Sequence, residues 1–171
     1  MIYHCCEENR QALVDAHSPL ATPAIERFHA LAHGDALVLD KWFALQATAP
    51  EPLGAGSGGA FQRARALLQH PEFSMKNPNR VRSLLFALCG SNPAAFHRTD
   101  AAGYVLWAEK LLELDAANPQ LAGRFARVMD RWSSLAEPWR SAAREALSRV
   151  AAKPDLSNDV REVVSRALEN A

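Results

Sequence analysis

Residues 77–97 read NPNRVRSLLFALCGSNPAAFH, and this stretch decides the fold class. An asparagine side-chain oxygen can cap a helix N-terminus, and proline suits the first helical position, where no N–H is needed. The Asn-Pro pairs that begin at Asn77, Asn92 and Asn118 therefore predict three helix starts. Gly90 lies where we expect the first of these helices to end in a left-handed residue.

Helical periodicity continues outside this stretch. Apolar residues recur at helical spacing along most of the chain, most clearly over 137–153 and 157–170, and no stretch alternates as a strand would. Asn77 and Asn118 lie 41 positions apart, and the period of HEAT and armadillo repeats is about 40 to 47 residues. We therefore predict an all-α fold, an irregular helical superhelix or HEAT/armadillo-like α-solenoid of about nine or ten helices.

The length of 171 residues fits one domain, so we expect residues 1–171 to form a single helical domain. The two prolines and four glycines of residues 48–60 predict a surface loop inside it. The three cysteines are Cys5, Cys6 and Cys89, an odd number without framework spacing, which favours reduced thiols.

Charge and hydropathy exclude several classes of partner. The 19 basic and 19 acidic residues give a formal net charge of zero, which argues against nucleic acid or an anionic membrane as a partner. No apolar run approaches the ~20 residues that span a bilayer, and the first residues lack the pattern of a secretory signal. We therefore expect a soluble, unexported, cytoplasmic protein.

The sequence offers one candidate metal site. His29 and His33 share a helix face at i, i+4 spacing, and Glu51 could follow as a third ligand. An H-E-x-x-H metallopeptidase needs a glutamate directly after the first histidine, and Ala30 stands there instead. There is also no Ser/His/Asp set, P-loop or dinucleotide fingerprint. We expect no catalytic residue, metal or cofactor in this chain.

The arginines are the remaining candidates. Arg82 lies beside the apolar run LLFALC, and Arg124 flanks the helix that Asn118 opens. A guanidinium in an apolar layer must find a carboxylate, carbonyl oxygens or a wet cavity. For Arg82 and Arg124 a structural ion pair and a ligand-facing role both stay open, whereas Arg127 and Arg131 are expected on a solvated flank.

Three blocks of sequence resemble a known family. DALVLDKWFALQATAP (35–50), LLQHPEFSMKNPNRVRSLLFALCGSNPAAFHRTDAAGY (67–104) and NPQLAGRF (118–125) are similar to the C-terminal domain of bacterial aminopeptidase N, a zinc metallopeptidase that removes N-terminal residues from peptides. The resemblance runs from about residue 35 to the C-terminus, and the glycine-rich loop at 54–59 departs from the family.

The resemblance implies a non-catalytic domain of a longer enzyme. In the family this helical superhelix packs over the catalytic domain, which holds the zinc and the general base, and closes the active site into a cavity. The motifs NPNRVRS and NPQLAGR would place Arg82, Arg124 and Arg80 on the peptide path. The implied partners are the catalytic domain of the same chain and peptide substrates, and this chain alone is expected to hydrolyse nothing.

Two other readings stay open. The helical architecture also suits a free-standing α-solenoid that binds other proteins, and His29 with His33 would suit an independent metal protein. An H-E-x-x-H motif upstream in the same reading frame would favour the aminopeptidase over both.

Overall fold

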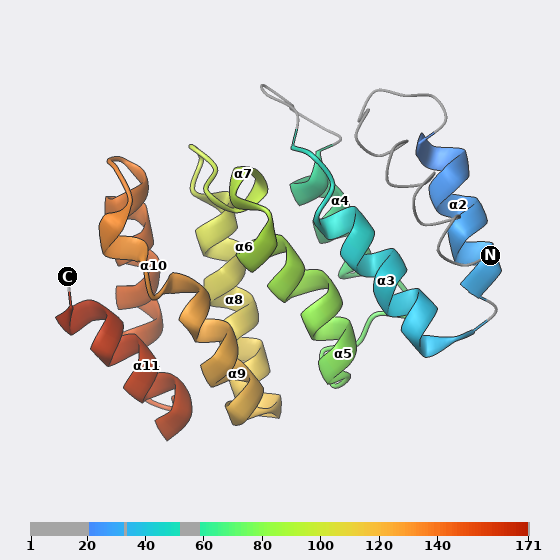
Figure 1. The fold of residues 1–171 in the computed structure, drawn as a ribbon. Helices are drawn as coiled ribbons and strands as arrows, with labels where there is room; N and C mark the ends of the chain where they lie inside the picture. The colour runs from blue at the N-terminus through green and yellow to red at the C-terminus, as the bar shows by residue number, and fades with distance from the viewer. Residues whose placement is uncertain (1–20, 33, 52–58, 171) are drawn as a thin grey trace. The chain divides into compact units, whose positions relative to one another are not determined.

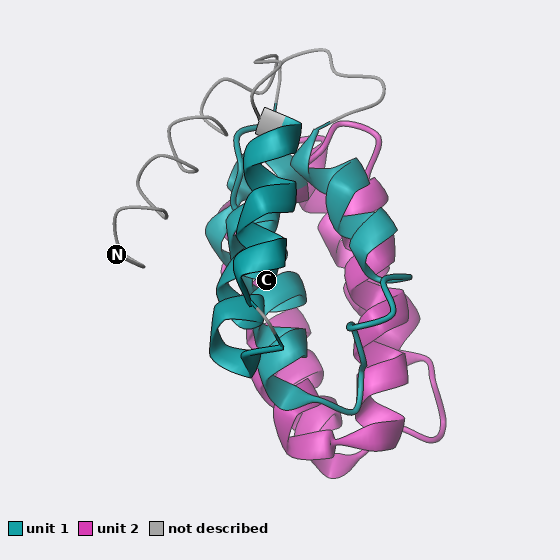
Figure 2. Cartoon of the chain, turned by 90° about the vertical axis from the view of Figure 1, so that its right-hand side faces the viewer, with its two compact units in different colours: residues 1–95 teal, residues 96–171 magenta. Residues whose placement is uncertain are grey.

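The computed structural model describes residues 21–32, 34–51 and 59–170. All regular secondary structure in these ranges is helical, so the predicted all-α fold is confirmed. The chain divides into two compact units, unit 1 (residues 1–95) and unit 2 (residues 96–171), which Figure 2 shows in different colours. The single-domain expectation stays a prediction.

Unit 1 is built around helix α3 (Figure 1). Its helices are α2 (Ala21–Ala32), α3 (Ala36–Ala47), α4 (Ala60–Leu67), α5 (Pro78–Val81), the π-helical turn η1 (Arg82–Phe86) and α6 (Ala87–Ser91), and α7 (Pro93–Phe96) ends at the unit boundary. Helix α3 packs against α2, α4 and η1. The core between them contains the fully buried side chains of Phe43, Phe61, Leu84 and Leu85.

The three predicted helix starts are confirmed. The side chain of Asn77 accepts hydrogen bonds from the N–H groups of the second and third residues after it, and α5 begins at the next residue, a proline. Asn118 caps α9 (Pro119–Ala126) through the N–H of the third residue after it. Asn92 accepts from Ala95 N–H at 3.2 Å at the start of α7. Capping depends on neighbours in sequence, so the sequence alone could predict it.

Asn92 also joins separate parts of unit 1. It is buried, and its Nδ2 donates to the carbonyl oxygens of Ala47 at 2.9 Å and Ala49 at 2.8 Å. The residue that starts α7 therefore also provides hydrogen bonds to carbonyl groups at and just after the C-terminal end of α3, where no helical N–H follows. The predicted interruption between helices comes directly after this point, since α3 ends at Ala47 and α4 begins at Ala60. Residues 52–58 of the predicted loop lie outside the described residues.

The expectation for Gly90 is wrong. Helix α6 continues to Ser91, and Gly34 is the glycine with a positive φ within the described ranges. Asn92 ends the helix at φ −126° and ψ 76° because Pro93 follows it, and a residue before proline is pushed out of the α region. The helix therefore stops without a left-handed residue.

Unit 2 is built from α-helices and short 3₁₀ turns. They are α8 (Ala102–Ala117), α9, the 3₁₀ turns η2 (Arg127–Met129) and η3 (Trp132–Ser134), α10 (Trp139–Ala151) and α11 (Asn158–Glu169). Helix α9 packs against α8 and α11, and α10 packs against the same two helices. The predicted amphipathic helices at 137–153 and 157–170 are thus confirmed as α10 and α11, which bury Leu147, Val150, Val160 and Val164.

Polar groups fix the helices of unit 2 to one another. Trp107 Nε1 donates to the carbonyl oxygen of Phe125, which joins α8 to α9. The buried carboxylate of Asp115 accepts from both the backbone N–H and the hydroxyl of Ser157, which is the N-cap of α11. These partners satisfy polar groups that would otherwise be buried without hydrogen bonds.

The surroundings of His97 predict that the stability of unit 2 depends on pH. Its Nδ1 lies 2.8 Å from the hydroxyl of Tyr104, and burial lowers the pKa of His97 while it raises the pKa of Tyr104 to about 12. The folded state thus favours a neutral imidazole. This contribution is present above the unfolded pKa of about 6.5 and is lost as the pH falls below it.

We therefore expect the free energy of unfolding to fall between about pH 7.5 and about pH 5. The variant His97→Asn keeps an acceptor near Tyr104 but does not titrate, so its stability should fall less over the same range. Urea unfolding of both proteins at the two pH values measures the difference. Equal pH dependence in the two proteins would exclude His97 as the cause.

Two further sequence-based expectations concern the cysteines and possible membrane-spanning helices. Cys89 is a buried free cysteine, and burial raises the pKa of its thiol, whereas Cys5 and Cys6 lie outside the described residues. Among the helices of the described ranges, none combines the length and apolar character needed to cross a bilayer.

Candidate functional site

Arg80 is the buried arginine of the segment NPNRVRS. Its guanidinium forms an ion pair with Asp40 of α3, and the two side chains are only 7% and 16% exposed. Arg80 Nη1 also donates to the carbonyl oxygen of Ala36, Arg80 Nε donates to that of Glu72, and the guanidinium lies 5.5 Å from the ring centre of Phe43. These contacts use the guanidinium within unit 1, so its geometry favours a structural role.

Arg82 is exposed, which corrects the expectation that its guanidinium lies against the apolar face of this helix. Its Nη1 donates to Asn79 Oδ1 at 3.2 Å. The buried face of α5, η1 and α6 carries Arg80 and Val81 and then leucines, while Arg82 and Gly90 lie on the exposed face. The sequence pattern could not select the buried arginine because its partner, Asp40, is 40 positions away.

Arg124 is exposed and lines a hollow between α9 and α11 in unit 2. The hollow has a volume of about 320 Å³, and its lining residues are Gln120, Gly123, Arg124, Arg127, Asp159, Glu162 and Val163. Gly123 allows the two helices to approach here, because a Cβ at this position would lie 3.2 Å from Asp159 Cβ. The wall therefore combines guanidinium groups, an amide and carboxylates.

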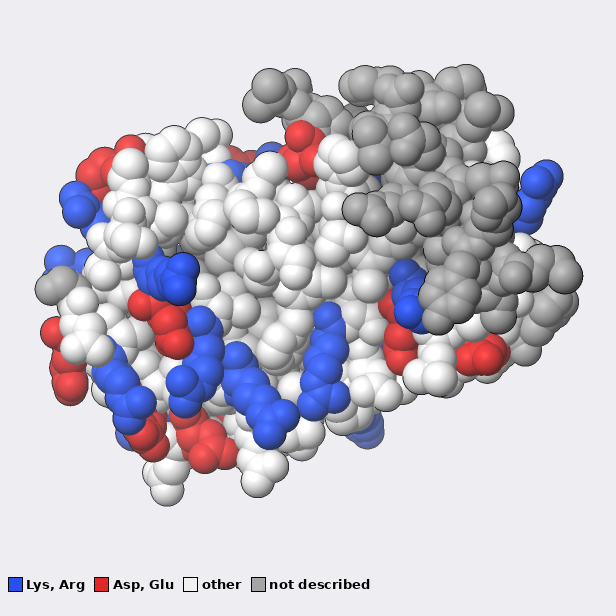
Figure 3. All heavy atoms as spheres, viewed as in Figure 1, with Lys and Arg blue, Asp and Glu red and all other residues white. Residues whose placement is uncertain are grey.

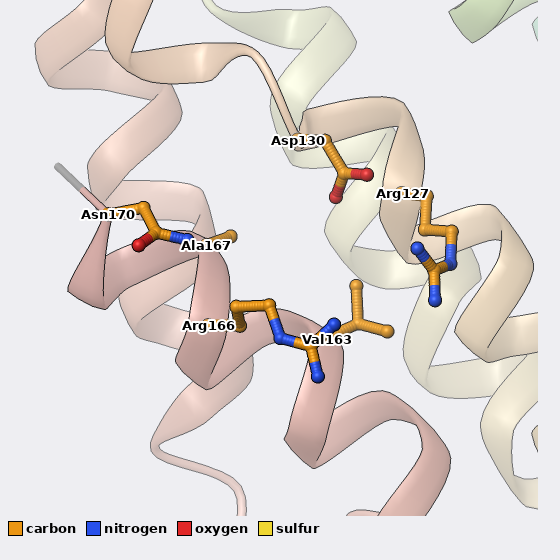
Figure 4. A pocket seen from close by; sticks show the side chains of 6 residues that line it. All are labelled: Arg127, Asp130, Val163, Arg166, Ala167 and Asn170. Atoms are coloured by element: carbon orange, nitrogen blue, oxygen red, sulfur yellow. The ribbon is translucent and has the colours of Figure 1, made fainter.

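A second hollow of about 200 Å³ shares Arg127 and Val163 with the first. In Figure 4, Arg127 and Asp130 line it from the segment that follows α9. Val163, Arg166 and Ala167 line it from α11, and Asn170 lines it from the position just after α11. Arg166 Nη2 donates to Glu162 Oε1 at 2.5 Å. We refer to these two neighbouring hollows together as the α9–α11 groove.

The charge distribution matches this mixed lining. Figure 3 shows Lys and Arg side chains interspersed with Asp and Glu side chains over α9 and α11, without a large field of one sign. Such a surface can offer guanidinium donors to a carboxylate or a carbonyl oxygen and carboxylate acceptors to N–H groups. Arg127, expected only on a solvated flank, is a lining residue that sequence reasoning missed.

The predicted metal ligands do not come together as expected. His33 lies outside the described residues, and Glu51 Oε2 accepts from the N–H of Phe61 at 3.0 Å, at the start of α4. His29 instead lies beside His70 and Glu72, with His29 Nε2 at 2.5 Å from Glu72 Oε2. The spacing H-x-E at 70–72 was a signal for this pair, but only the fold brings it to His29.

Helices with capped starts that pack on their sequence neighbours are typical of helical-repeat proteins. The chain belongs to the DUF3458_C family, a domain of unknown function described as ARM repeats, which matches residues 10–169. The expected repeat architecture is thereby confirmed.

Bacterial aminopeptidases contain similar segments. Aminopeptidase N of Escherichia coli (strain K12) is 38% identical over 157 residues, which are 92% of this chain and 17% of that protein. Aminopeptidase N of Caulobacter vibrioides is 40% identical over 145 residues, which are 85% of this chain and 16% of that protein. The resemblance to the C-terminal domain of aminopeptidase N is confirmed.

A solved structure agrees with these sequence relatives. Legionella pneumophila aminopeptidase A, crystallised in complex with aspartic acid, superimposes with a TM-score of 0.79 at 27% identity. The match covers 88% of this chain and 17% of that chain. This chain therefore spans about a sixth of the length of the aminopeptidases it matches.

Proposed function

We propose that this chain is the non-catalytic C-terminal domain of a zinc-dependent aminopeptidase that removes N-terminal amino acids from peptides. The observation that carries the proposal is the similarity to aminopeptidase N over 92% of the chain. In this proposal the domain packs over a catalytic domain, encloses the active-site cavity in a cytoplasmic enzyme and contributes to the peptide channel.

The residues present do not fit a catalytic zinc of the H-E-x-x-H type. The full sequence contains no such motif, and the glutamate that would act as general base is missing after each histidine. Zinc and the chemistry of hydrolysis would belong to the catalytic domain, and no chemical step is assigned to residues of this chain.

Arg82 and Arg124 are the proposed channel residues of this chain. Both are exposed, and in the described ranges Arg82 has only the neutral amide oxygen of Asn79 as a side-chain partner. Arg124 lines the α9–α11 groove without a hydrogen bond or ion pair of its own in the described part of the chain. A free guanidinium can donate two parallel hydrogen bonds to a peptide carboxylate, which lysine cannot do.

Arg80 is not retained as a channel residue in this proposal. Its guanidinium is buried and bonded to Asp40 and to two carbonyl oxygens, so a peptide could reach it only if these contacts broke. Arg80 would instead hold the start of α5, two residues before Arg82, in place.

Kinetics of the full-length enzyme test the proposal. Arg82→Ala and Arg124→Ala should each lower kcat/KM for a tetrapeptide by about 10- to 150-fold, because one charge-assisted contact contributes about 1.5 to 3 kcal/mol. Hydrolysis of a small chromogenic amino-acid amide should change little, since it does not reach the channel. Arg149→Ala is the matched control, because Arg149 is exposed on α10 and pairs with Glu145.

Two results would contradict the channel role. Parallel losses for the tetrapeptide and the amide, with a lower melting temperature, would indicate structural arginines. No loss for either substrate would show that neither arginine contacts the peptide. The alternative, a free-standing α-solenoid that binds other proteins, would be favoured if the same reading frame encoded no H-E-x-x-H motif.

A further inference from the structure

Three side chains with metal-binding atoms converge in unit 1. His29 lies near the end of α2, and His70 and Glu72 lie in the turn after α4. One ligand atom from each lies within 4.8 Å of the other two. We propose that these residues, the His29–His70–Glu72 site, bind a divalent transition-metal ion of the zinc type. This reverses the sequence-based expectation of a chain without metal.

The donor set suits zinc. Two imidazoles and one carboxylate leave a fourth position for water, and tetrahedral bonds of about 2.0 to 2.2 Å place ligand atoms roughly 3.3 Å apart. His29 Nε2 and Glu72 Oε2, at 2.5 Å, would move apart, and the most distant pair would move closer by about 1.5 Å. The side chains of His29 and Glu72 are 37% and 39% exposed, which leaves room for these adjustments.

Aromatic packing holds the imidazoles in place. The ring of His29 lies 4.6 Å from that of Trp42, and the ring of His70 lies 5.2 Å from it. Trp42 Nε1 donates to the carbonyl oxygen of Ile25 at 3.0 Å, which fixes α3 against α2. Ligands oriented by packed neighbours lose less freedom when a metal binds.

The turn that carries Glu72 is also anchored. Arg80 Nε donates to the carbonyl oxygen of Glu72 at 3.1 Å, and the guanidinium is itself bonded to Asp40. The carboxylate therefore projects from a backbone held by a buried side chain. This anchor holds the backbone of Glu72, whose carboxylate lies beside His29 across 43 positions of sequence.

Metal binding requires a rearrangement of the protons at the site. The proton between His29 Nε2 and Glu72 Oε2 must leave this position when both atoms coordinate the ion: a neutral imidazole then carries it on Nδ1, and an imidazolium also releases one proton to solvent. His70 Nδ1 accepts from the N–H of Glu72. This hydrogen bond is lost whichever ring nitrogen coordinates, because a neutral imidazole that binds through Nε2 carries its proton on Nδ1. The His29–Glu72 contact and the hydrogen bond to His70 are both exposed, so coordination bonds to the ion can replace them. The bound ion would then join α2 to the turn before α5.

Titration of the full 171-residue chain tests the site. After removal of metal with a chelator, calorimetry with Zn²⁺ should give about one ion per chain, and Co²⁺ should give a visible tetrahedral spectrum. His29→Ala, His70→Ala and Glu72→Gln should each weaken Zn²⁺ binding by about 100-fold or more, because loss of a ligand exceeds the 10- to 100-fold effect of an outer partner. Saturating Zn²⁺ should raise the melting temperature of the parent chain but not that of these three ligand variants.

Two control variants exclude rival donors. His33→Ala tests the His29–His33 pair, and Cys5→Ser with Cys6→Ser tests the thiols near the chain start; both should bind Zn²⁺ as the parent does. Circular dichroism of each metal-free variant verifies folding, and Glu72→Gln keeps a hydrogen-bonding side chain in place of the carboxylate.

Zn²⁺ binding lost in either control but kept in His70→Ala and Glu72→Gln would overturn the site, as would no binding above that of a variant lacking all three ligands. The readout is metal binding by this chain, so failure here leaves the proposed aminopeptidase role untouched.

Discussion

Replacing Arg80 with alanine should lower the free energy of unfolding of unit 1 by about 3 to 5 kcal/mol. The substitution leaves the carboxylate of Asp40 largely buried and without its ion-pair partner. It also leaves the carbonyl oxygens of Ala36 and Glu72 without the guanidinium N–H groups that they accept from. Removal of one partner from a buried pair costs more than removal of both, because the remaining charge loses its compensation.

Arg82→Ala is the matched control for Arg80→Ala. Arg82 is exposed two residues away, so its loss should change stability by no more than about 0.5 kcal/mol. The double variant Arg80→Met with Asp40→Leu replaces the pair by apolar side chains and should recover part of the stability.

Urea unfolding, together with hydrogen exchange of the α3 and α5 amides, measures these changes within unit 1. Equal losses for Arg80→Ala and Arg82→Ala would contradict the assignment of Arg80 as the buried anchor.

Gly103→Ala should destabilise unit 2 by about 3 kcal/mol. A Cβ at position 103 would lie 2.0 Å from the carbonyl oxygen and 2.8 Å from the carbonyl carbon of Phe96. These are backbone atoms and cannot turn aside as the end of a flexible side chain could. The start of α8 would have to move away from Phe96, which would loosen the packing of Tyr104 against the Phe96 ring.

Gly90→Ala is the same substitution, but we expect it to stabilise the protein. Gly90 is exposed within α6, and a Cβ there would meet no heavy atom within 4 Å. Alanine should therefore stabilise the chain by about 0.4 to 1 kcal/mol, because it restricts the unfolded state and favours the helix. Thermal or urea unfolding of the two variants checks the pair. A Gly103→Ala protein as stable as the parent would show that α8 does not approach Phe96 so closely.

Local signals predicted the helices and the family. The Asn-Pro pairs at Asn77, Asn92 and Asn118 cap helices through groups two or three residues away, so no tertiary information was needed. The stripes of α10 and α11 were equally readable, because each helix buries a face that recurs with its own period. The sequence blocks around NPNRVRS and NPQLAGRF were enough to indicate the aminopeptidase resemblance.

The candidate sites depended on contacts that the sequence order conceals. Arg80 and Arg82 are the same residue type in the same motif, so the sequence does not distinguish them. Arg80 is the one that is buried, and it pairs with the carboxylate of Asp40 on another helix. Glu72 lies beside His29, 43 positions away in sequence, and Arg80 on another helix bonds the backbone of Glu72. The sequence by itself therefore determined the helices, their starts and the family. Only the tertiary structure decided which charged and imidazole side chains meet, because ion pairs and ligand clusters are set by distances in space.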